Sequence, residues 1–389
     1  MQRPSGARED VTIETTGPTE AEYDPHVEFR AVRKTFGSTV AVDDLTLGVA
    51  KGTFTTLLGP SGCGKTTTLR MLAGFFDPDV GDVLIGGVRQ NGVPPNRRNV
   101  SIVFQDYALF PHMTVLQNVS YGLRLRRVST AERERRVARV LAFLGLDALG
   151  RRHPFELSGG QQQRVALGRS IVMEPDVLLM DEPLSNLDAK LRIRVRAELK
   201  DIQRALGITT IYVTHDQDEA LSLSDRVAVM NEGRLLQYSD PWELYHAPVN
   251  RFVADFVGYA NVLPGRVLSA EYGKATVAIV ASPGAALRCL DPVGRASPGA
   301  EVGVMVRPEW FAVNGEAADH PAGSAGLGLE GEVQSRSYQG AFARAWVRIK
   351  GVGEPLVIEA TMTRRDQLAV GTRLHLHVPH ERAVVVDGG

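Results

Sequence analysis

Several features that would define a class of protein are scarce in this 389-residue chain. It has only two cysteines, Cys63 and Cys289, which excludes a disulfide framework and a paired-cysteine zinc site and fits a reducing compartment. The net charge is −1, so the chain lacks the overall basic charge of nucleic-acid-binding proteins. Because no apolar run reaches about 18 residues and the N-terminus has no apolar stretch, we expect neither a transmembrane segment nor a signal peptide.

The length and the hydrophobic pattern predict more than one domain. A chain of 389 residues is too long for one ordinary core. Residues 1–25 are polar, acidic and contain three prolines, which predicts a disordered leader. From 26 to 260 short strands alternate with helices, which predicts a parallel sheet covered by helices, with a mostly helical part at about 115–160. Residues 261–389 show many short strands, which predicts one or two small barrels.

One phosphate-binding loop is predicted between a strand and a helix. Its backbone N–H groups suit a β-phosphate, the Lys65 amine can reach the β- and γ-phosphates, and the Thr66 hydroxyl can bind Mg²⁺. The candidate residues are Gly59, Pro60, Ser61, Gly62, Cys63, Gly64, Lys65, Thr66 and Thr67.

A second candidate phosphate-binding segment lies roughly 90 residues later, at Ser158, Gly159, Gly160 and Gln161. We predict that the serine and glycines stand before a helix over 164–172, whose unpaired N–H groups and partial positive charge favour an anion. Two such segments predict a nucleotide held between two surfaces, which a single phosphate loop does not require.

Two carboxylates follow an apolar strand predicted at 177–180. Asp181 suits Mg²⁺ coordination, directly or through water, and Glu182 can polarise an attacking water. A pair of solvated turn carboxylates is the alternative.

Three further residues each allow a functional and a structural interpretation. Gln105 and His215 each follow a predicted strand at the sheet edge where ligands bind, yet either can be purely structural. Phe36 can stack on an adenine or belong to the core. Likewise, the arginine-rich segment 124–140 fits a solvated amphipathic helix or a nucleic-acid patch.

Together, these segments resemble the ATP-binding subunit of an ABC transporter over about residues 27–260. The resemblance implies an α/β P-loop NTPase with a RecA-like core plus antiparallel-β and helical subdomains. In family terms the matching segments are Phe36 (adenine-stacking aromatic), 59–66 (Walker A), Gln105 (glutamine loop), 157–161 (signature), 177–181 with Glu182 (Walker B and general base), 185–188 (aspartate loop, with Asp188) and His215 (switch histidine).

This resemblance also implies roles and ligands. Lys65, Gln105, Glu182 and His215 are expected to be catalytic, and Thr66, Gln105 and Asp181 to hold Mg²⁺ beside ATP. The family forms a homodimer in which the signature of one subunit, with Asp188 nearby, meets the nucleotide on the other.

The C-terminal part resembles the OB-like, TOBE-type β-barrel region of importers for sugars, polyamines, ferric iron and sulfate. Segments 94–98, 107–115, 256–261 and 306–309 carry that likeness. It implies solute import driven from the cytoplasmic face of the membrane, with spermidine/putrescine or ferric iron as cargo and sugar or sulfate as the alternative.

The implied partners are two transmembrane permease subunits, which dock near 107–114, and an extracytoplasmic solute-binding protein; no nucleic acid is expected. Tyr107, Leu109 and Phe110 fit either a permease groove or ordinary packing between subdomains. A soluble ABC ATPase acting on ribosomes or DNA is the alternative from another class, and a P-loop nucleotide kinase is a third.

Overall fold

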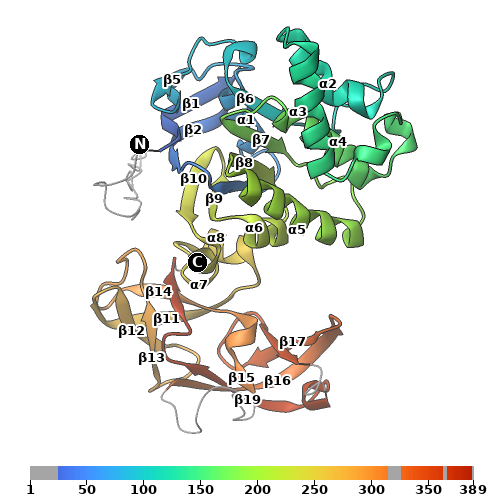
Figure 1. Ribbon diagram of the computed structural model, residues 1–389. Helices are drawn as coiled ribbons and strands as arrows, with labels where there is room; N and C mark the ends of the chain where they lie inside the picture. Colours follow the sequence, from blue (N-terminus) through green and yellow to red (C-terminus); the bar gives the residue numbers. More distant parts are fainter. Residues whose placement is uncertain (1–24, 314–325, 362–365, 388–389) are drawn as a thin grey trace.

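The computed structural model describes residues 25–313, 326–361 and 366–387 (Figure 1). The predicted disordered leader therefore lies, except for residue 25, outside the described residues. Among the described residues, no helix is long and apolar enough to cross a membrane.

The larger part contains a four-stranded antiparallel sheet and a six-stranded sheet. The antiparallel sheet has the order β2 (Thr39–Val49), β1 (Val27–Phe36), β4 (Val80–Ile85) and β5 (Val88–Arg89). The second sheet has the order β10 (Arg234–Ser239), β9 (Arg226–Asn231), β3 (Phe54–Leu58), β8 (Thr209–Thr214), β7 (Val177–Asp181) and β6 (Val100–Val103). Only the β9–β10 pair is antiparallel, so the carboxyl ends of the other strands share one edge.

Eight α-helices accompany the two sheets in the described residues. They are α1 (Lys65–Ala73), α2 (Val115–Leu125), α3 (Thr130–Phe143), α4 (Gly159–Ile171), α5 (Ala189–Leu206), α6 (Gln217–Leu223), α7 (Pro241–His246) and α8 (Arg251–Val257). Helix α1 packs on β7 and β8, α4 packs on β6, and α2 and α3 pack on α4. Strand β7 shows why the sheet is central: Val177 and Leu179 pack into the core that holds α1, whereas Leu178 and Met180 pack into the core beneath α2–α4. An apolar strand buried on both faces is typical of a parallel sheet.

The C-terminal part is all β, as predicted. A closed barrel contains β11 (Asn261–Glu271), β12 (Lys274–Ile279), β13 (Ala286–Leu290), β20 (Val384–Val386) and β14 (Glu301–Val306). A five-stranded sheet has the order β15 (Ala312–Val313), β19 (Arg373–Pro379), β16 (Gly326–Tyr338), β17 (Phe342–Ile349) and β18 (Leu356–Thr361). One apolar cluster joins the two sheets. Figure 1 shows α7 and α8 between this part and the larger one. The division at residue 261 stays a prediction and coincides with the start of β11.

One expectation about an element was wrong, and one strand was not predicted. Helix α4 begins at Gly159, five positions before the predicted start, because Ser158 caps it and donates its N–H to the Gln161 side chain at 2.9 Å. The unpredicted strand is β10.

Candidate active site

The loop between β3 and α1 is shaped by glycines at positions that a side chain would block. At Gly64 the backbone has a φ of +103°, and a Cβ there would lie 2.4 Å from the Ala41 carbonyl oxygen. A Cβ on Gly59 would lie 2.2 Å from the Met230 carbonyl oxygen. The chain can therefore make this tight turn only without side chains at these positions, and the loop's N–H groups can come close to an anion.

Lys65 is buried at the first position of α1, and its amine already faces the loop. The Nζ atom donates to the carbonyl oxygens of Gly59 at 2.7 Å and Pro60 at 2.8 Å, and lies 3.7 Å from Cys63 Sγ. A cation held inside a loop of N–H donors suits a phosphate group.

Asp181 lies next to the start of α1, as the sequence predicts. The Thr66 hydroxyl donates to its Oδ1 at 3.0 Å, and Arg70 Nη2 lies 4.0 Å from Oδ2. Burial raises the pKa of the Asp181 carboxyl, although the Thr66 hydrogen bond opposes that shift. The hydroxyl and carboxylate are the oxygen donors that Mg²⁺ prefers. Among the described residues, no group of three or more His, Cys, Asp or Glu side chains is arranged to hold a metal by itself.

Glu182 turns away from Asp181 and meets His215. The backbone of Glu182 is left-handed, with a φ of +46°. His215 Nδ1 lies 3.2 Å from Glu182 Oε2, and the Glu182 N–H donates to the Val213 carbonyl at 3.0 Å. The two neighbouring carboxylates therefore have different partners: Asp181 contacts Thr66 on α1, and Glu182 contacts His215 after β8.

Gln105 lies beyond the end of β6, where it meets the segment that follows Glu182. Its side-chain amide donates to Ser185 Oγ at 3.1 Å, and its backbone carbonyl accepts from Asn186 Nδ2 at 2.9 Å. Ser185 Oγ in turn donates to the Glu182 carbonyl at 3.0 Å. Asp188, further along, caps α5 by accepting from the Leu191 N–H at 2.9 Å.

The segment from Ser158 to Gln161 forms the first turn of α4. Ser158 is exposed and Gly160 is buried, and a Cβ on Gly159 would lie 2.9 Å from Leu187. Among the residues that the structure describes, no hydrogen bond joins this segment to the loop at 59–66. The first N–H groups of a helix have no partner within it, so this turn can bind an anion brought by another surface.

Phe36, at the end of β1, is 48% exposed and therefore is not a core residue. Its ring packs edge-on against Phe76 at a centroid distance of 5.4 Å, and the Lys34 amine lies 5.6 Å from the ring centre. An exposed ring held on one side is suited to stacking on a flat ligand.

Tyr107, by contrast, is buried among the residues under α2 and α4, so its side chain follows the ordinary-packing alternative. Leu109 and Phe110 are half-buried, and the Phe110 ring packs against Tyr121 at 4.6 Å.

Arg70 was not predicted from the sequence, and neither were the contacts with Gln105 that Ser185 and Asn186 make, although both residues lie in the aspartate loop expected at 185–188. Helical spacing could have found Arg70, because it follows Thr66 by four residues and therefore lies on the same face of α1. Ser185 and Asn186 carry no comparable signal, since their contact with Gln105 joins segments about 80 positions apart.

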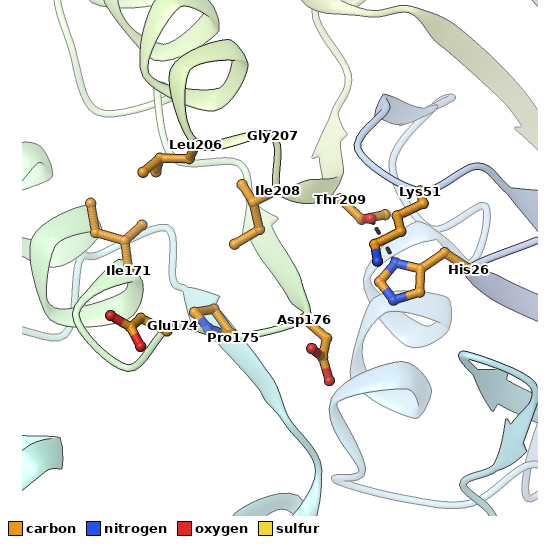
Figure 2. Close-up of a pocket in the computed structure, with 10 residues that line it drawn as sticks. All are labelled: His26, Lys51, Ile171, Glu174, Pro175, Asp176, Leu206, Gly207, Ile208 and Thr209. Atoms are coloured by element: carbon orange, nitrogen blue, oxygen red, sulfur yellow. Dashed lines mark hydrogen bonds between the residues drawn. The ribbon is translucent and has the colours of Figure 1, made fainter.

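Two cavities lie elsewhere in the larger part. One, of about 270 Å³, is at the opposite edge of the sheet, where His26, Lys51, Asp176 and Thr209 come together (Figure 2). The other, of about 570 Å³, lies over α2 and α3, with Leu116, Arg124 and Val137 among its lining residues.

The fold and this site define a P-loop ATPase. The family model for the ABC transporter matches residues 42–185, and that for the TOBE domain matches 304–386. The spermidine/putrescine import ATP-binding protein PotA of Rubrobacter xylanophilus is 52% identical over 295 residues, which is 76% of this chain and 78% of that protein. The Fe(3+) ions import ATP-binding protein FbpC of Brucella abortus is 49% identical over 314 residues, or 81% and 85% of the two chains.

The chain therefore belongs to the family of ATP-binding, ATP-hydrolysing ABC transporter proteins, which confirms the resemblance seen in the sequence. A solved structure of cbiO1 from Clostridium perfringens, described as part of the ABC transporter complex cbiONQ, matches with a TM-score of 0.53 and 30% identity. That match covers 60% of this chain and 93% of the other. The expected α/β P-loop fold with a C-terminal OB-like domain is confirmed as well.

Proposed function

We propose that this chain hydrolyses ATP at the cytoplasmic face of a membrane to drive import of a polyamine or of ferric iron. The relatives quoted above are import ATP-binding proteins for spermidine/putrescine and for Fe(3+) ions. The single observation that supports hydrolysis best is the separation of Asp181 and Glu182 toward two different partners, Thr66 and His215.

The loop at 59–67 and Phe36 are the proposed nucleotide-binding residues. The loop N–H groups and Lys65 bind the phosphates, and the exposed Phe36 ring stacks on the adenine. Thr66 and Asp181 would hold Mg²⁺, with the Gln105 side-chain oxygen as a further ligand. When bound, ATP would supply the γ-phosphoryl group that is transferred to water, and Mg²⁺ would neutralise the charge that develops on it.

Glu182 is the proposed general base. Its carboxylate accepts a proton from the attacking water, and the contact with His215 orients it for that task. Lys65 and His215 donate toward the charge that builds on the γ-phosphoryl oxygens.

The partner that completes the site is a second copy of this chain. The first turn of α4, with Ser158, Gly159, Gly160 and Gln161, would bind the γ-phosphate held by the other copy, with Asp188 near the contact. Within the described part of one chain, no hydrogen bond joins this turn to the phosphate loop, and the exposed Ser158 and Asp188 leave this face open.

We also propose that two membrane-embedded permease subunits dock near Tyr107–Thr114, beside the cavity over α2 and α3. The residues that line this cavity begin directly after that segment, and they combine apolar side chains such as Leu116 and Val137 with charged ones such as Arg124. Solute delivery by an extracytoplasmic binding protein completes the system.

Glu182→Gln tests the proposed chemistry. We expect the rate of ATP hydrolysis to fall by about 10²–10⁴-fold, because the amide cannot accept the proton. ATP binding should persist, and the variant should form an ATP-dependent dimer in light scattering. Glu232→Gln is the matched control, since Glu232 is also left-handed, with a φ of +48°, and lies in the β9–β10 turn. Normal turnover by Glu182→Gln would refute the role.

The cargo needs a separate experiment. The chain should co-purify with its permease, and vesicles holding the complex should take up labelled spermidine or Fe³⁺ only with ATP. Uptake of a sugar or sulfate instead would leave the ATPase proposal intact and change the cargo.

A further inference from the structure

Arg98 is a charged residue buried in the ATPase part, outside the site described above. It directly follows a 3-10 turn (Pro95–Arg97), and its side chain is only 1% exposed. All five guanidinium N–H groups have acceptors: Nε donates to Val93 O at 2.8 Å, Nη1 to Met71 O at 2.7 Å and Leu72 O at 3.0 Å, and Nη2 to Gln90 O at 2.7 Å and Asp77 Oδ1 at 3.4 Å.

Two of these acceptors are end carbonyls of α1, the helix that begins at Lys65. The carbonyls of the last helical turn have no partner within the helix, and they carry its partial negative charge. The Arg98 cation therefore satisfies the Leu72 carbonyl, adds a second donor to the Met71 carbonyl, which also accepts from the Gly74 N–H at 3.1 Å, and favours the helix dipole. Since α1 has only nine residues, fixing its last turn also fixes its first.

The guanidinium also lies against the segment that leads from α1 to Phe76. A Cβ on Gly74 would lie 2.6 Å from Arg98 Nε, and Asp77 accepts from Nη2. Between them, Phe76 packs on the exposed Phe36 ring. One side chain thus contacts both the helix that carries Lys65 and the segment that supports Phe36.

We propose that Arg98 is a positioning residue for the nucleotide, which holds α1 and the 74–77 segment at the spacing that lets the phosphate loop and Phe36 bind one ATP together. This inference rests on the proposed nucleotide site. The guanidinium hydrogen bonds of Arg98 reach neither β7 nor β8, which precede Glu182 and His215, so we assign its contribution to binding rather than to the chemical step.

Arg98→Lys is the first test, because lysine keeps the charge but offers only three donors from one point. We expect the Kd and KM for ATP to rise by about tenfold, while kcat at saturating ATP changes by less than about threefold. Val27→Ala, which removes buried apolar atoms from the same core, controls for stability alone: it should lower Tm and leave KM unchanged.

Gly74→Ala is the second test, since it displaces the guanidinium without removing it. Its control is Gly207→Ala, at the left-handed end of α5, where a Cβ would have no neighbour within 4 Å. Both changes add backbone strain, with φ of +84° and +59°, but only Gly74→Ala should weaken ATP binding.

The outcomes separate the two proposals. Failure of the wild-type chain to bind ATP would overturn the nucleotide site itself. ATP binding by Arg98→Lys and Gly74→Ala at the wild-type Kd would overturn the positioning role alone. Unfolding of both, with Gly207→Ala still folded, would make Arg98 a purely structural residue and also overturn it.

Discussion

Among the described residues, buried polar side chains gather at a candidate reactive site in the ATPase part but not in the β-rich C-terminal part. In the ATPase part, Lys65, Asp181 and Thr214 are buried at the carboxyl edge of the sheet, where the candidate chemistry lies. In the described residues of the C-terminal part, the buried polar side chains are Asn261, Asp291 and Arg307. Asn261 bonds to the Val306 and Val357 carbonyls, and Asp291 accepts from the N–H groups of Arg295 and Ala296. These three therefore hold the backbone together and form no reactive cluster.

Arg307 shows this difference most clearly. The side chain is fully buried and donates to carbonyls on the ATPase side: Ala254 at 2.7 Å, Tyr259 at 3.1 Å and Tyr245 at 3.1 Å. Its guanidinium lies 4.2 Å from the Tyr245 ring centre, and the Tyr245 hydroxyl donates to Glu309 at 2.8 Å. Burial lowers the pKa of Arg307. A buried charge is used here to attach the barrel to α7 and α8.

The largest expected effect is on the ATPase side of this comparison. Lys65→Met should weaken ATP binding by about 2–5 kcal/mol, or at least about 30-fold in Kd, because the phosphates lose a buried cation. The stability of both parts should change little, since methionine fills a similar volume. Calorimetric titration with ATP checks the first statement and thermal melting the second. A large fall in Tm would show that the lysine is structural, like Arg307.

The second largest expected effect is a loss of stability in the C-terminal part, with ATP binding kept. Arg307→Met leaves several carbonyls without donors, and each buried acceptor left unsatisfied costs about 1–3 kcal/mol. We expect a lower Tm and faster proteolysis between α8 and β11, with the KM for ATP within about twofold of wild type. Limited trypsin digestion and steady-state kinetics measure the two. A tenfold change in KM with an unchanged Tm would show that Arg307 acts in ATP binding rather than in stability, and would contradict the proposed difference between the two parts.

The smallest effect concerns the cavity at the far edge of the sheet (Figure 2). His26 shares a hydrogen bond with Thr209 Oγ1 at 2.7 Å, and burial lowers the pKa of its imidazole from the ordinary 6.5. Below pH 6.5 the unfolded chain then takes up more protons at this residue than the folded chain, so acid reduces stability. His26→Gln should flatten the fall in Tm between about pH 7 and pH 5. Parallel curves for the two proteins would exclude this contribution.

Local patterns predicted most of the ATPase fold. The strand and the helix predicted on either side of the phosphate-binding loop are β3 and α1, and β7 ends one residue beyond the predicted 177–180, because apolar runs and turn residues mark these elements strongly. The start of α4 was misplaced because two glycines lower helix propensity. The pattern Ser158-x-x-Gln161 is itself a capping box, so the correct signal was present. Strand β10 was missed although Glu232 and Gly233, both with positive φ, mark a hairpin turn.

The candidate site shows which features local sequence patterns can and cannot predict. The phosphate loop and the carboxylates follow from residue type and spacing. The contacts of Gln105 with Ser185 and Asn186 depend on how β6 and the segment after β7 pack, which no short pattern encodes. Tyr107 illustrates the same limit, since an aromatic residue in a loop fits either a docking surface or a core, and only packing decided for the core.

The left-handed backbone of Glu182 bears on the outcome of saturation mutagenesis at this position. Positive φ is costly for β-branched residues, by about 1–3 kcal/mol, and mild for asparagine or glycine. Valine, isoleucine and threonine will therefore score as damaging for conformational reasons that have nothing to do with proton transfer. Only unbranched replacements such as glutamine test the loss of the carboxylate without added backbone strain. In a fitness profile of all side chains at Glu182, the β-branched variants should therefore score below the unbranched ones.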